Sequence, residues 1–261
     1  MRGLYAIYRK EMGHYFVSPV AYVVVGVFLA LSAFFFNYFL AAVLQQALQM
    51  QMQEMEVGMH PNLDVTVEVM RAFFGLLSTL ILFLTPMLTM SVYAEERKRG
   101  TMELLMTSPI TEAQIVIGKF LASLTLFAIM MLPTAGYLVF VYFNSDPVPP
   151  WRMLWGGYLG VVLLGSCLLS LGSFISSLTE NQLIAAVLTF AAFLVVWIID
   201  LGSNGSGVAS SVLQYLSLIR HFDDFSRGVI DTSSLIYYLS FILFFVFLTV
   251  RSVDSMRWRR A

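Results

Sequence analysis

Long runs of apolar residues constrain this chain more than any other feature. Residues 23–36 read VVVGVFLALSAFFF, a run that is apolar on every face of a helix. A helix needs about 20 such residues to cross a hydrocarbon core of roughly 30 Å. Six blocks approach this length, and they predict spans at Val20–Leu44, Ala72–Tyr93, Phe120–Phe143, Met153–Ile175, Leu183–Ile199 and Leu235–Val250. We therefore expect an all-α integral membrane protein whose six transmembrane helices form a single domain over residues 1–261.

The low charge content excludes several other classes of protein. Only 12% of the residues are charged, against about 25% in soluble domains. The net charge of −1 gives no indication of a nucleic-acid partner, so the lipid bilayer is the expected environment. The single cysteine, Cys167, lies inside the fourth apolar block, where it can neither close a disulfide within the chain nor join a CxxC metal site.

Positive charges predict the orientation of the spans. Most Lys and Arg residues lie before the first span, between the second and third spans, or after the last one: Arg2, Arg9, Lys10, Arg97, Lys98, Arg99, Lys119, Arg251, Arg257, Arg259 and Arg260. Fewer lie on the opposite side: Arg71, Arg152, Arg220 and Arg227. Because loops rich in Lys and Arg stay in the cytoplasm, we expect both termini and the second loop segment to be cytoplasmic.

Two segments outside the spans are expected to lie at the membrane surface. Residues 3–16, GLYAIYRKEMGHYF, put their larger apolar side chains on one helical face, which is typical of a helix lying on the cytoplasmic surface. Residues 202–234 open with GSNGSG and continue with apolar pieces that are too short to cross. These pieces predict a broken re-entrant segment that dips into the outer leaflet. Pro86 and Pro133 lie within the second and third spans, where they predict kinks and are candidate hinges.

The first outer loop is rich in methionine and allows two interpretations. Its soft thioether groups and one imidazole are the candidate metal ligands of the chain: Met50, Met52, Met55, Met59 and His60. On the outer side such groups can hold Cu(I). Three of the methionines also recur at helical spacing, which indicates a simple extension of the first helix. The helical interpretation is favoured, so no metal site is predicted.

A charged segment, EERKRGTMELLMTSPI at residues 95–110, separates two of the long apolar blocks. Glu95 and Arg99 stand four residues apart in the favourable order, so the second helix is expected to continue to Arg99. Gly100 can then end that helix in a left-handed conformation. A short helix is expected from Thr101 to Met106.

The residues after this short helix predict a turn and a new helix. Thr107-Ser108-Pro109 favours an extended turn, and Thr111 with Gln114 forms a capping box that starts the third span. The result is an elbow made of helix, short helix and helix. Its apolar face of Met102, Leu105 and Met106 fits a groove on a partner protein. The alternative is that the short helix lies on the membrane surface between two spans.

The sequence lacks the nucleotide-binding and hydrolase motifs that were sought in it. Nucleotide binding by the phosphate loop requires GxxxxGK[ST], but Gly118-Lys119 is followed by phenylalanine and has no upstream glycine at the right spacing. The sequence also contains no HExxH or GxSxG motif. We therefore expect no catalytic residue and no cofactor in this chain, and any ATP must be hydrolysed by another one.

The elbow pattern E-E-R-K-x-G-T-[LM]-E-L-L-x-T-x-P-[IV] resembles the cytoplasmic loop between the second and third helices of type-2 ABC-exporter permeases. The start of the chain, YRKEMGHYFVSPVAYVVVGVF, is similar to that of the gliding-motility permease subfamily. The stretches LQYLSLIRHFDDFSRGVID and LIYYLSFILFFVFLT near the end show the same similarity. All three also resemble the permease used in nitrous-oxide-reductase copper-site maturation.

The resemblance implies a permease subunit of the bacterial inner membrane that is not itself an enzyme. It implies a second permease chain, identical or paralogous, and a cytoplasmic dimer of ABC ATPases that binds ATP and Mg. A membrane-anchored protein with a large outer domain is a further implied partner. The elbow would be the coupling helix that docks the ATPase through Glu95, Glu96, Arg97, Gly100, Thr101, Met102, Glu103, Leu104, Leu105, Met106 and Pro109. The alternative is a mechanical transmitter that relays ATPase motion to an outer partner, because the spans are poor in polar residues.

Overall fold

The computed structural model describes residues 2–57, 65–145, 148–202, 214–215 and 217–258. Within this part of the chain every regular element is a helix, which confirms the all-α prediction. The helices are α1 (Arg2–Val17), α2 (Pro19–Val57), α3 (Val65–Thr89), α4 (Ala94–Lys98), α5 (Thr101–Met106), α6 (Glu112–Met131), α7 (Ala135–Asn144), α8 (Trp151–Leu178), α9 (Gln182–Gly202), α11 (Leu218–Ser226) and α12 (Thr232–Trp258). A short 3-10 turn, η1 (Leu132–Thr134), joins α6 to α7.

Five helical stretches in the described part are long and apolar enough to cross a membrane. They are Pro19–Gln49, Thr66–Lys98, Glu112–Asn144, Trp151–Leu178 and Thr232–Met256. They contain five of the predicted spans. The remaining span, Leu183–Ile199, falls in α9, whose apolar stretch Gln182–Ile198 is shorter than the others. The structure therefore confirms a helical protein with several spans, and the count of six stays a prediction.

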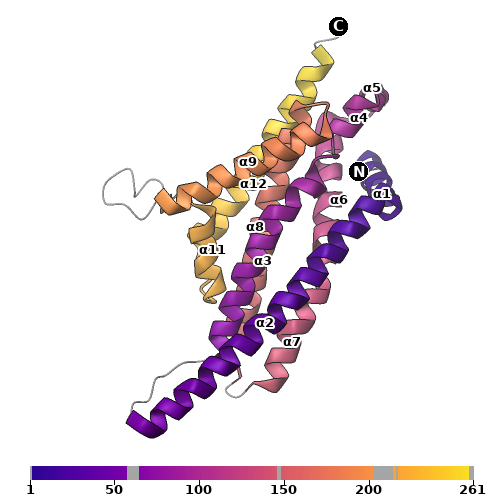
Figure 1. The fold of residues 1–261 in the computed structure, drawn as a ribbon. Coiled ribbons are helices and arrows are strands. Elements are labelled where there is room, and N and C mark those ends of the chain that lie inside the picture. The colour runs from indigo at the N-terminus through magenta and orange to yellow at the C-terminus, as the bar shows by residue number, and fades with distance from the viewer. Residues whose placement is uncertain (1, 58–64, 146–147, 203–213, 216, 259–261) are drawn as a thin grey trace.

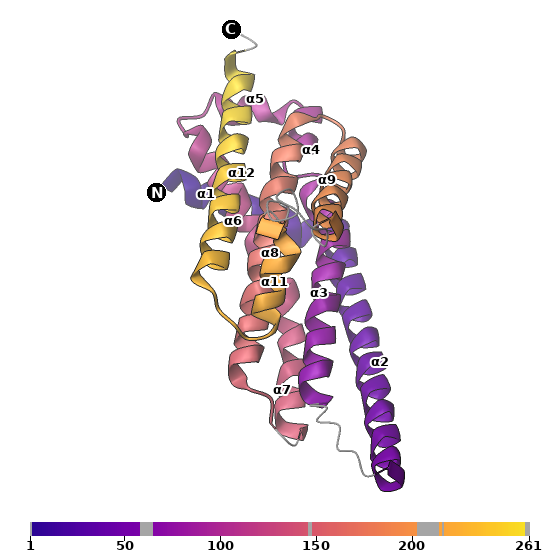
Figure 2. The same cartoon turned by 90° about the vertical axis from the view of Figure 1, so that its left-hand side faces the viewer.

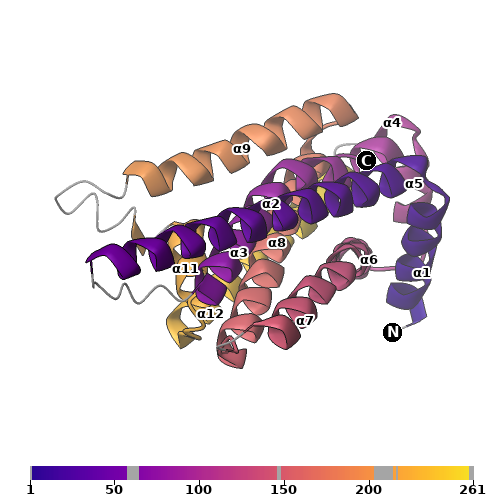
Figure 3. The ribbon, with the colours of Figure 1, turned by 60° about the horizontal axis from the view of Figure 1, so that its bottom comes forward.

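Helix α8 is the centre of the bundle (Figures 1 and 2) and is the most buried of the spanning helices. It packs against α3, α12, α11 and α9. Small residues make this possible, since a Cβ atom added at Gly157 would lie 2.2 Å from the ring of Phe74. Helix α9 lies on the outside, against α3 and α8 (Figure 3).

The two ends of the bundle differ in what they hold. Figures 1 and 2 show α1, α4, α5 and the end of α12 at one end, and the ends of α2 and α7 at the other. This arrangement agrees with the predicted common side of the two termini and the elbow. The side of the membrane that each end faces stays a prediction.

Helix α2 is longer than a bilayer crossing requires. It has 39 residues, roughly 60 Å at 1.5 Å per residue, and its last turns hold Met50, Met52 and Met55. The helical interpretation is thus confirmed as far as Val57. Met52 is exposed. Met59 and His60 lie outside the described residues, so the less favoured alternative, Cu(I) binding by this loop, is not decided.

The N-terminal helix α1 packs against α6, so it does not rest on lipid alone. The Tyr8 hydroxyl donates to Thr125 Oγ1 at 3.2 Å, and the hydroxyls of Tyr15 and Ser123 lie 2.8 Å apart. The face of α1 that was predicted to lie on the membrane surface is therefore used in protein contacts. Sequence periodicity identified the apolar face correctly but could not tell protein from lipid as its partner.

Both prolines lie near the end of a helical segment. Pro86 is inside α3, which ends one turn later at Thr89. Pro133 is in η1, where α6 gives way to α7. The carbonyl of Met131 accepts a hydrogen bond from the Tyr158 hydroxyl at 3.0 Å. The kinks expected at these prolines and their hinge function both remain predictions.

Only the second half of the predicted re-entrant segment, residues 202–234, can be described. Helix α11 packs against α8 and α9 (Figure 2). The Tyr238 hydroxyl of α12 donates to the Leu218 carbonyl at 2.7 Å. Both ring nitrogens of His221 have partners, the Ser234 hydroxyl at 2.9 Å and the Tyr215 carbonyl at 3.1 Å. Residues 203–213 and 216 lie outside the described part.

Candidate functional site

The elbow begins with a break between α3 and α4. Residues 90–93 form a turn, so the prediction of one helix continuing to Arg99 is wrong. The cause is a side chain from α8. The Ser176 hydroxyl donates to the Met90 carbonyl at 3.1 Å and accepts from the backbone N–H groups of Tyr93 at 3.2 Å and Ala94 at 3.3 Å. These bonds replace the helical ones that the turn gives up.

The corner of the elbow has the predicted local structure. Glu95 and Arg99 form an ion pair within α4. Gly100 has φ of +71°, the left-handed conformation that glycine adopts without strain. The Thr101 hydroxyl donates back to the Glu96 carbonyl at 3.3 Å, which braces α5 against α4. Helix α5 spans the residues expected for it, so these predictions are confirmed.

The residues that lead out of α5 also follow the prediction. The Ser108 hydroxyl donates to the Leu105 carbonyl at 2.6 Å. Thr111 and Gln114 form the capping box, with the Gln114 N–H donating to Thr111 Oγ1 at 3.3 Å. The chain passes through Pro109 into α6. Both limbs of the elbow are therefore defined by local hydrogen bonds.

The apolar face of α5 points into the protein. Met102 is only 4% exposed and packs in a small core with Val116 of α6 and Val253 of α12. Leu105 packs on the same core, and the side chain of Met106 lies outside the described part. The prediction that this face meets a partner protein is therefore wrong for Met102. The exposed residues of α5 are Thr101, Glu103 and Leu104.

Leu104 gives the tip of the elbow an apolar character. Its exposed fraction is 72%, among the highest of the large apolar residues in the described part. It lies next to exposed Glu103 on the side of α5 away from Met102. Leu104 is therefore the large apolar side chain that the described part of α5 exposes.

Arg97 ties the elbow to the end of α8. Its guanidinium donates to the Ser177 carbonyl at 2.7 Å and to the Glu180 carboxylate at 3.1 Å. The side chain is 21% exposed. Arg97 was predicted to dock a partner, but these contacts give it a role within the chain.

A buried lysine, Lys119, lies behind the elbow and binds three separate segments. Its side chain is 1% exposed, and its Nζ lies 2.9 Å from Glu11 Oε1 of α1, from Glu96 Oε2 of α4 and from the Val92 carbonyl. We call Glu11, Glu96, Lys119 and the Val92 carbonyl the lysine hub. Two of these contacts, to Glu11 and to the Val92 carbonyl, are hydrogen bonds, and the contact with Glu96 Oε2 is an ion pair.

Lys10 completes the charge balance beside the lysine hub. It forms ion pairs with Glu11 and Glu96, so two cations face two carboxylates. Partial burial acts to lower the pKa of Lys10, but the two carboxylates, Glu96 foremost, outweigh it and raise that pKa above its usual value. Lys10 is therefore charged near neutral pH.

Sequence reasoning missed the lysine hub. Lys119 was counted as a cation of the loop, whereas it lies inside α6 and is buried. A signal was present, because the capping box at Thr111 places Lys119 two turns into the helix. Ser176 and Glu11 gave no comparable signal, since their partners are distant in the sequence.

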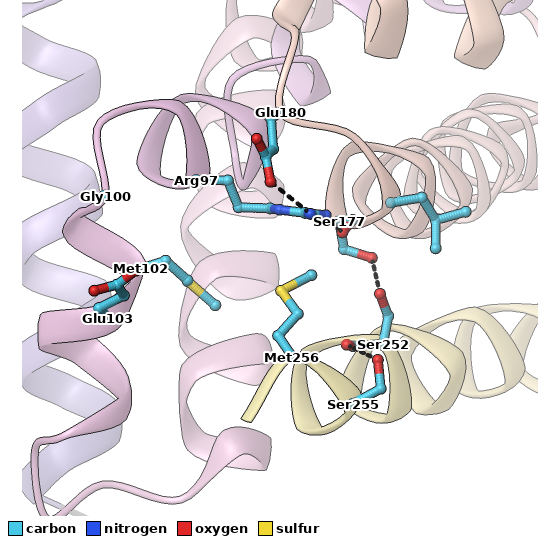
Figure 4. Close-up of a pocket in the computed structure, with 10 residues that line it drawn as sticks. Arg97, Gly100, Met102, Glu103, Ser177, Glu180, Ser252, Ser255 and Met256 are labelled. Atoms are coloured by element: carbon cyan, nitrogen blue, oxygen red, sulfur yellow. Dashed lines mark hydrogen bonds and ion pairs between the residues drawn. The ribbon is translucent and has the colours of Figure 1, made fainter. Parts of the chain in front are cut away.

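A cleft of about 340 Å³ opens beside the elbow (Figure 4). It is lined by Arg97, Gly100, Met102 and Glu103 of the elbow, by Ser177, Leu178 and Glu180 at the end of α8, and by Ser252, Ser255 and Met256 of α12. The Ser177 hydroxyl donates to Ser252 Oγ at 2.8 Å at its base. Figure 4 shows Met102 and Met256 pointing toward each other across the opening. The elbow, α8 and α12 thus share one surface.

A second cleft, of about 480 Å³, lies between α3, α8, α9 and α11. Apolar residues dominate its walls, among them Leu82, Phe83, Leu164, Leu168, Val196 and Trp197. Arg71 of α3 and Arg220 of α11 also line it, together with Asp223 of α11. The cleft therefore combines an apolar wall with two positive charges and one negative charge.

The sequence of the chain is similar to those of known proteins. Residues 5–253 match the family described as ABC-2 family transporter protein. The chain is 26% identical over 179 residues to the probable multidrug ABC transporter permease YbhR of Escherichia coli K12, and equally to YbhR of Escherichia coli O157:H7. The match covers 65% of this chain and 45% of each relative, so the chain spans about half the length of these relatives. Because the family match includes nearly all of it, the chain belongs to the ABC-2 family of membrane transporter proteins.

Proposed function

We propose that the chain is the permease subunit of an ABC transporter and that a separate cytoplasmic ATPase moves it through the α4–α5 elbow. The observation that carries this proposal is the contrast within α5. Its inner face is fixed in the protein by Met102, while its outer face presents Leu104 and Glu103 to solvent. An exposed leucine on a rigid support is suited to a groove on a partner protein.

The support transmits force because it is attached to several helices. Helix α5 is joined to α3 through α4 and to α6 through residues 107–111. Its inner face also packs on Val253 of α12. Close-packed interiors transmit displacement and do not absorb it. A push on Leu104 would therefore reach three spanning helices.

The proposal includes the setting and the partners. The termini and the elbow would face the cytoplasm from the inner membrane of a bacterium, and α9 would cross as the sixth span. A second permease chain would complete the transmembrane unit, and a membrane-anchored protein with an outer domain would meet its opposite end. ATP and Mg would be bound by the ATPase dimer. The predicted positive charge of the elbow side supports this orientation.

The cleft between α3 and α9 suggests a class of cargo. Its apolar walls suit a hydrocarbon or aromatic body, and Arg71 and Arg220 suit an anionic group. The relatives are named as probable multidrug permeases, which agrees with a cargo of small amphiphilic molecules. We therefore propose an anionic amphiphile as the first class to test.

The second candidate function is mechanical transmission without a cargo. Hydroxyl groups in the spans mostly bond to their own helix, as Thr85 does to the Ile81 carbonyl at 2.5 Å and Thr89 to the Thr85 carbonyl at 3.0 Å. Such hydroxyls do not line a polar path. Purified complex in vesicles decides between the two functions. ATP-dependent uptake of a fluorescent anionic amphiphile supports transport, and intact ATP hydrolysis with no uptake of any amphiphile supports transmission.

The docking proposal is tested with a charge placed at the tip of the elbow. Leu104→Asp should reduce co-purification of the ATPase with the permease, because a buried carboxylate would replace an apolar contact. Ala113→Asp is the matched control, since it adds the same charge at an exposed position in the first turn of α6. Unchanged co-purification and ATPase rate in Leu104→Asp would contradict docking at this surface.

A further inference from the structure

The lysine hub joins elements that the chain itself does not place together. Glu11 lies in α1, Val92 in the turn before α4, Glu96 in α4 and Lys119 in α6. All three acceptors contact one ammonium group at 2.9 Å. Removal of the ammonium would leave two carboxylates and a carbonyl short of a buried donor. The hub is therefore a point at which the first limb of the elbow is fixed to α1 and α6.

Helix α1 is in turn rigidly continuous with the first spanning helix. Ser18 is the one residue between α1 and α2, and its N–H donates to the His14 carbonyl at 3.0 Å. The Tyr22 hydroxyl of α2 reaches back to the Phe16 carbonyl at 2.8 Å. A displacement of α1 would therefore carry the start of α2 with it. Outside the hub and Lys10, the elbow meets α1 through a contact of 3.9 Å between Nε2 of half-exposed His14 and Glu95 Oε2, and it meets the end of α8 through Arg97.

Lys119 and Lys10 differ in the exposure of their side chains to solvent. Both cations contact Glu11 and Glu96, but the side chain of Lys10 is 51% exposed and that of Lys119 is 1% exposed. Exposed pairs are screened and contribute little, whereas a buried cation held by two hydrogen bonds and two carboxylates keeps its partners in one geometry. The fixed link between α1 and the elbow thus depends on Lys119.

From this geometry we propose that Lys119 is a positioning residue that makes α1, the elbow and α6 one rigid body, so that ATPase motion also reaches α2. The inference rests on the proposed coupling function. It adds α2 to the helices that move and assigns the N-terminal helix α1 to the moving part. The carboxylate of Glu11 is the contact through which α1 is held.

Distances between spin labels in the assembled complex with its ATPase test this inference. Labels at Arg9→Cys of α1 and Lys98→Cys of α4 report the rigid body, and a label at Trp155→Cys of α8 is the reference. All three positions are exposed, and Cys167 is buried and should not react. When the lysine hub is intact, the distance between the labels at positions 9 and 98 should have a single value, and ATP should not change it. The distances from 9 to 155 and from 98 to 155 should both shift on ATP binding.

Lys119→Met should release α1 from the elbow. The distribution of distances between the labels at positions 9 and 98 should broaden and become dependent on ATP. The ATP-induced change in the distance between positions 9 and 155 should become smaller, whereas the change between positions 98 and 155 should persist. Lys10→Met is the matched control and should behave as the unsubstituted protein. Glu11→Ala should reproduce the release while Lys119 keeps its bonds to the elbow, so the test stands even if Lys119→Met fails to fold.

The experiment distinguishes a failure of the role of Lys119 from a failure of the coupling function. A single, ATP-independent distance from 9 to 98 in Glu11→Ala or Lys119→Met would overturn the role of Lys119 and leave the coupling function standing. Absence of any ATP-dependent shift from 98 to 155 in the unsubstituted complex would instead remove the coupling function, and this inference with it.

Discussion

The two ends of the helical bundle are held together by different kinds of contact. At the elbow, Lys119 and Ser176 make hydrogen bonds and ion pairs between helices that are far apart in the sequence. In the half away from the elbow, aromatic rings meet: Phe36 of α2 stacks on Tyr137 of α7 with centroids 4.7 Å apart and lies edge-on to Phe73 of α3 at 5.3 Å. Charged and directional bonds thus dominate at the elbow, whereas aromatic contacts dominate in the other half, with single hydrogen bonds such as that of Tyr158 to the Met131 carbonyl.

The two kinds of contact differ in how much movement between helices they allow. A hydrogen bond weakens steeply when its distance or angle changes, whereas burial of apolar surface has no preferred direction. The elbow end is therefore built to keep one internal geometry while it moves. The aromatic half can tolerate small sliding between helices. Such a division suits a protein that receives a push at one end and changes shape at the other.

The largest expected effect is loss of the buried lysine. Lys119→Met leaves Glu11 and Glu96 with only half-exposed Lys10 as partner. Loss of one partner from a buried charge cluster costs about 3–5 kcal/mol, so thermal unfolding in detergent should occur at a clearly lower temperature. The double variant Lys119→Met/Glu11→Gln restores neutrality and should recover part of the loss. Equal unfolding temperatures for Lys119→Met and the unsubstituted protein would show that the hub is not a stabilising contact.

The next effect concerns the break between α3 and α4. Ser176→Ala removes the acceptor of the Tyr93 and Ala94 N–H groups, at a cost of about 1–3 kcal/mol for buried donors left unpaired. Hydrogen exchange at residues 90–94 should accelerate. Ser170→Ala is the control, because the Ser170 hydroxyl bonds only to the Cys167 carbonyl of its own helix. Similar exchange in both variants would mean that Ser176 does not hold the turn.

A smaller effect is expected in the aromatic half. Phe36→Leu keeps an apolar side chain but loses the ring contacts, which contribute about 0.5–1.5 kcal/mol. Stability should fall slightly, and the rate of ATP hydrolysis by the assembled complex should not change. A clear loss of ATP hydrolysis in Phe36→Leu would erase the contrast between the two halves.

The smallest effect is expected for the surface ion pair of α4. The side chain of Arg99 is 66% exposed and pairs with Glu95 one turn away. Exposed pairs contribute about 0–1 kcal/mol, so Arg99→Ala should unfold almost as the unsubstituted protein does. Raising the salt concentration should remove the remaining difference. A large and salt-independent loss would assign Arg99 to the rigid part of the elbow.

Local signals in the sequence predicted the elbow well. Gly100, the Thr101–Met106 helix and the Thr111 capping box depend on residues within a few positions of one another, and the structure has all three. The apolar blocks predicted the spanning helices for the same reason, since each block is one continuous segment. The shortness of the apolar stretch in α9 leaves the count of six as a prediction.

Contacts between distant residues could not be predicted. The turn at residues 90–93 depends on Ser176, which is more than eighty positions away, and the burial of Lys119 depends on Glu11. The apolar face of α5 was recognised, but periodicity alone does not tell whether such a face meets a partner or the same chain. Burial of Met102 against Val253 decides this in favour of the chain.

The most direct test of the central claim is the accessibility of Leu104 in the complex. Leu104→Cys would be treated with a membrane-impermeant maleimide, with and without the ATPase bound, and Val148→Cys, in the loop before α8, would serve as the exposed control outside the spans. We predict that the ATPase protects Leu104→Cys and leaves Val148→Cys reactive, and that protection changes when ATP binds. Equal labelling of Leu104→Cys in the free permease and in the assembled complex would contradict the proposal that the elbow receives the motion of the ATPase.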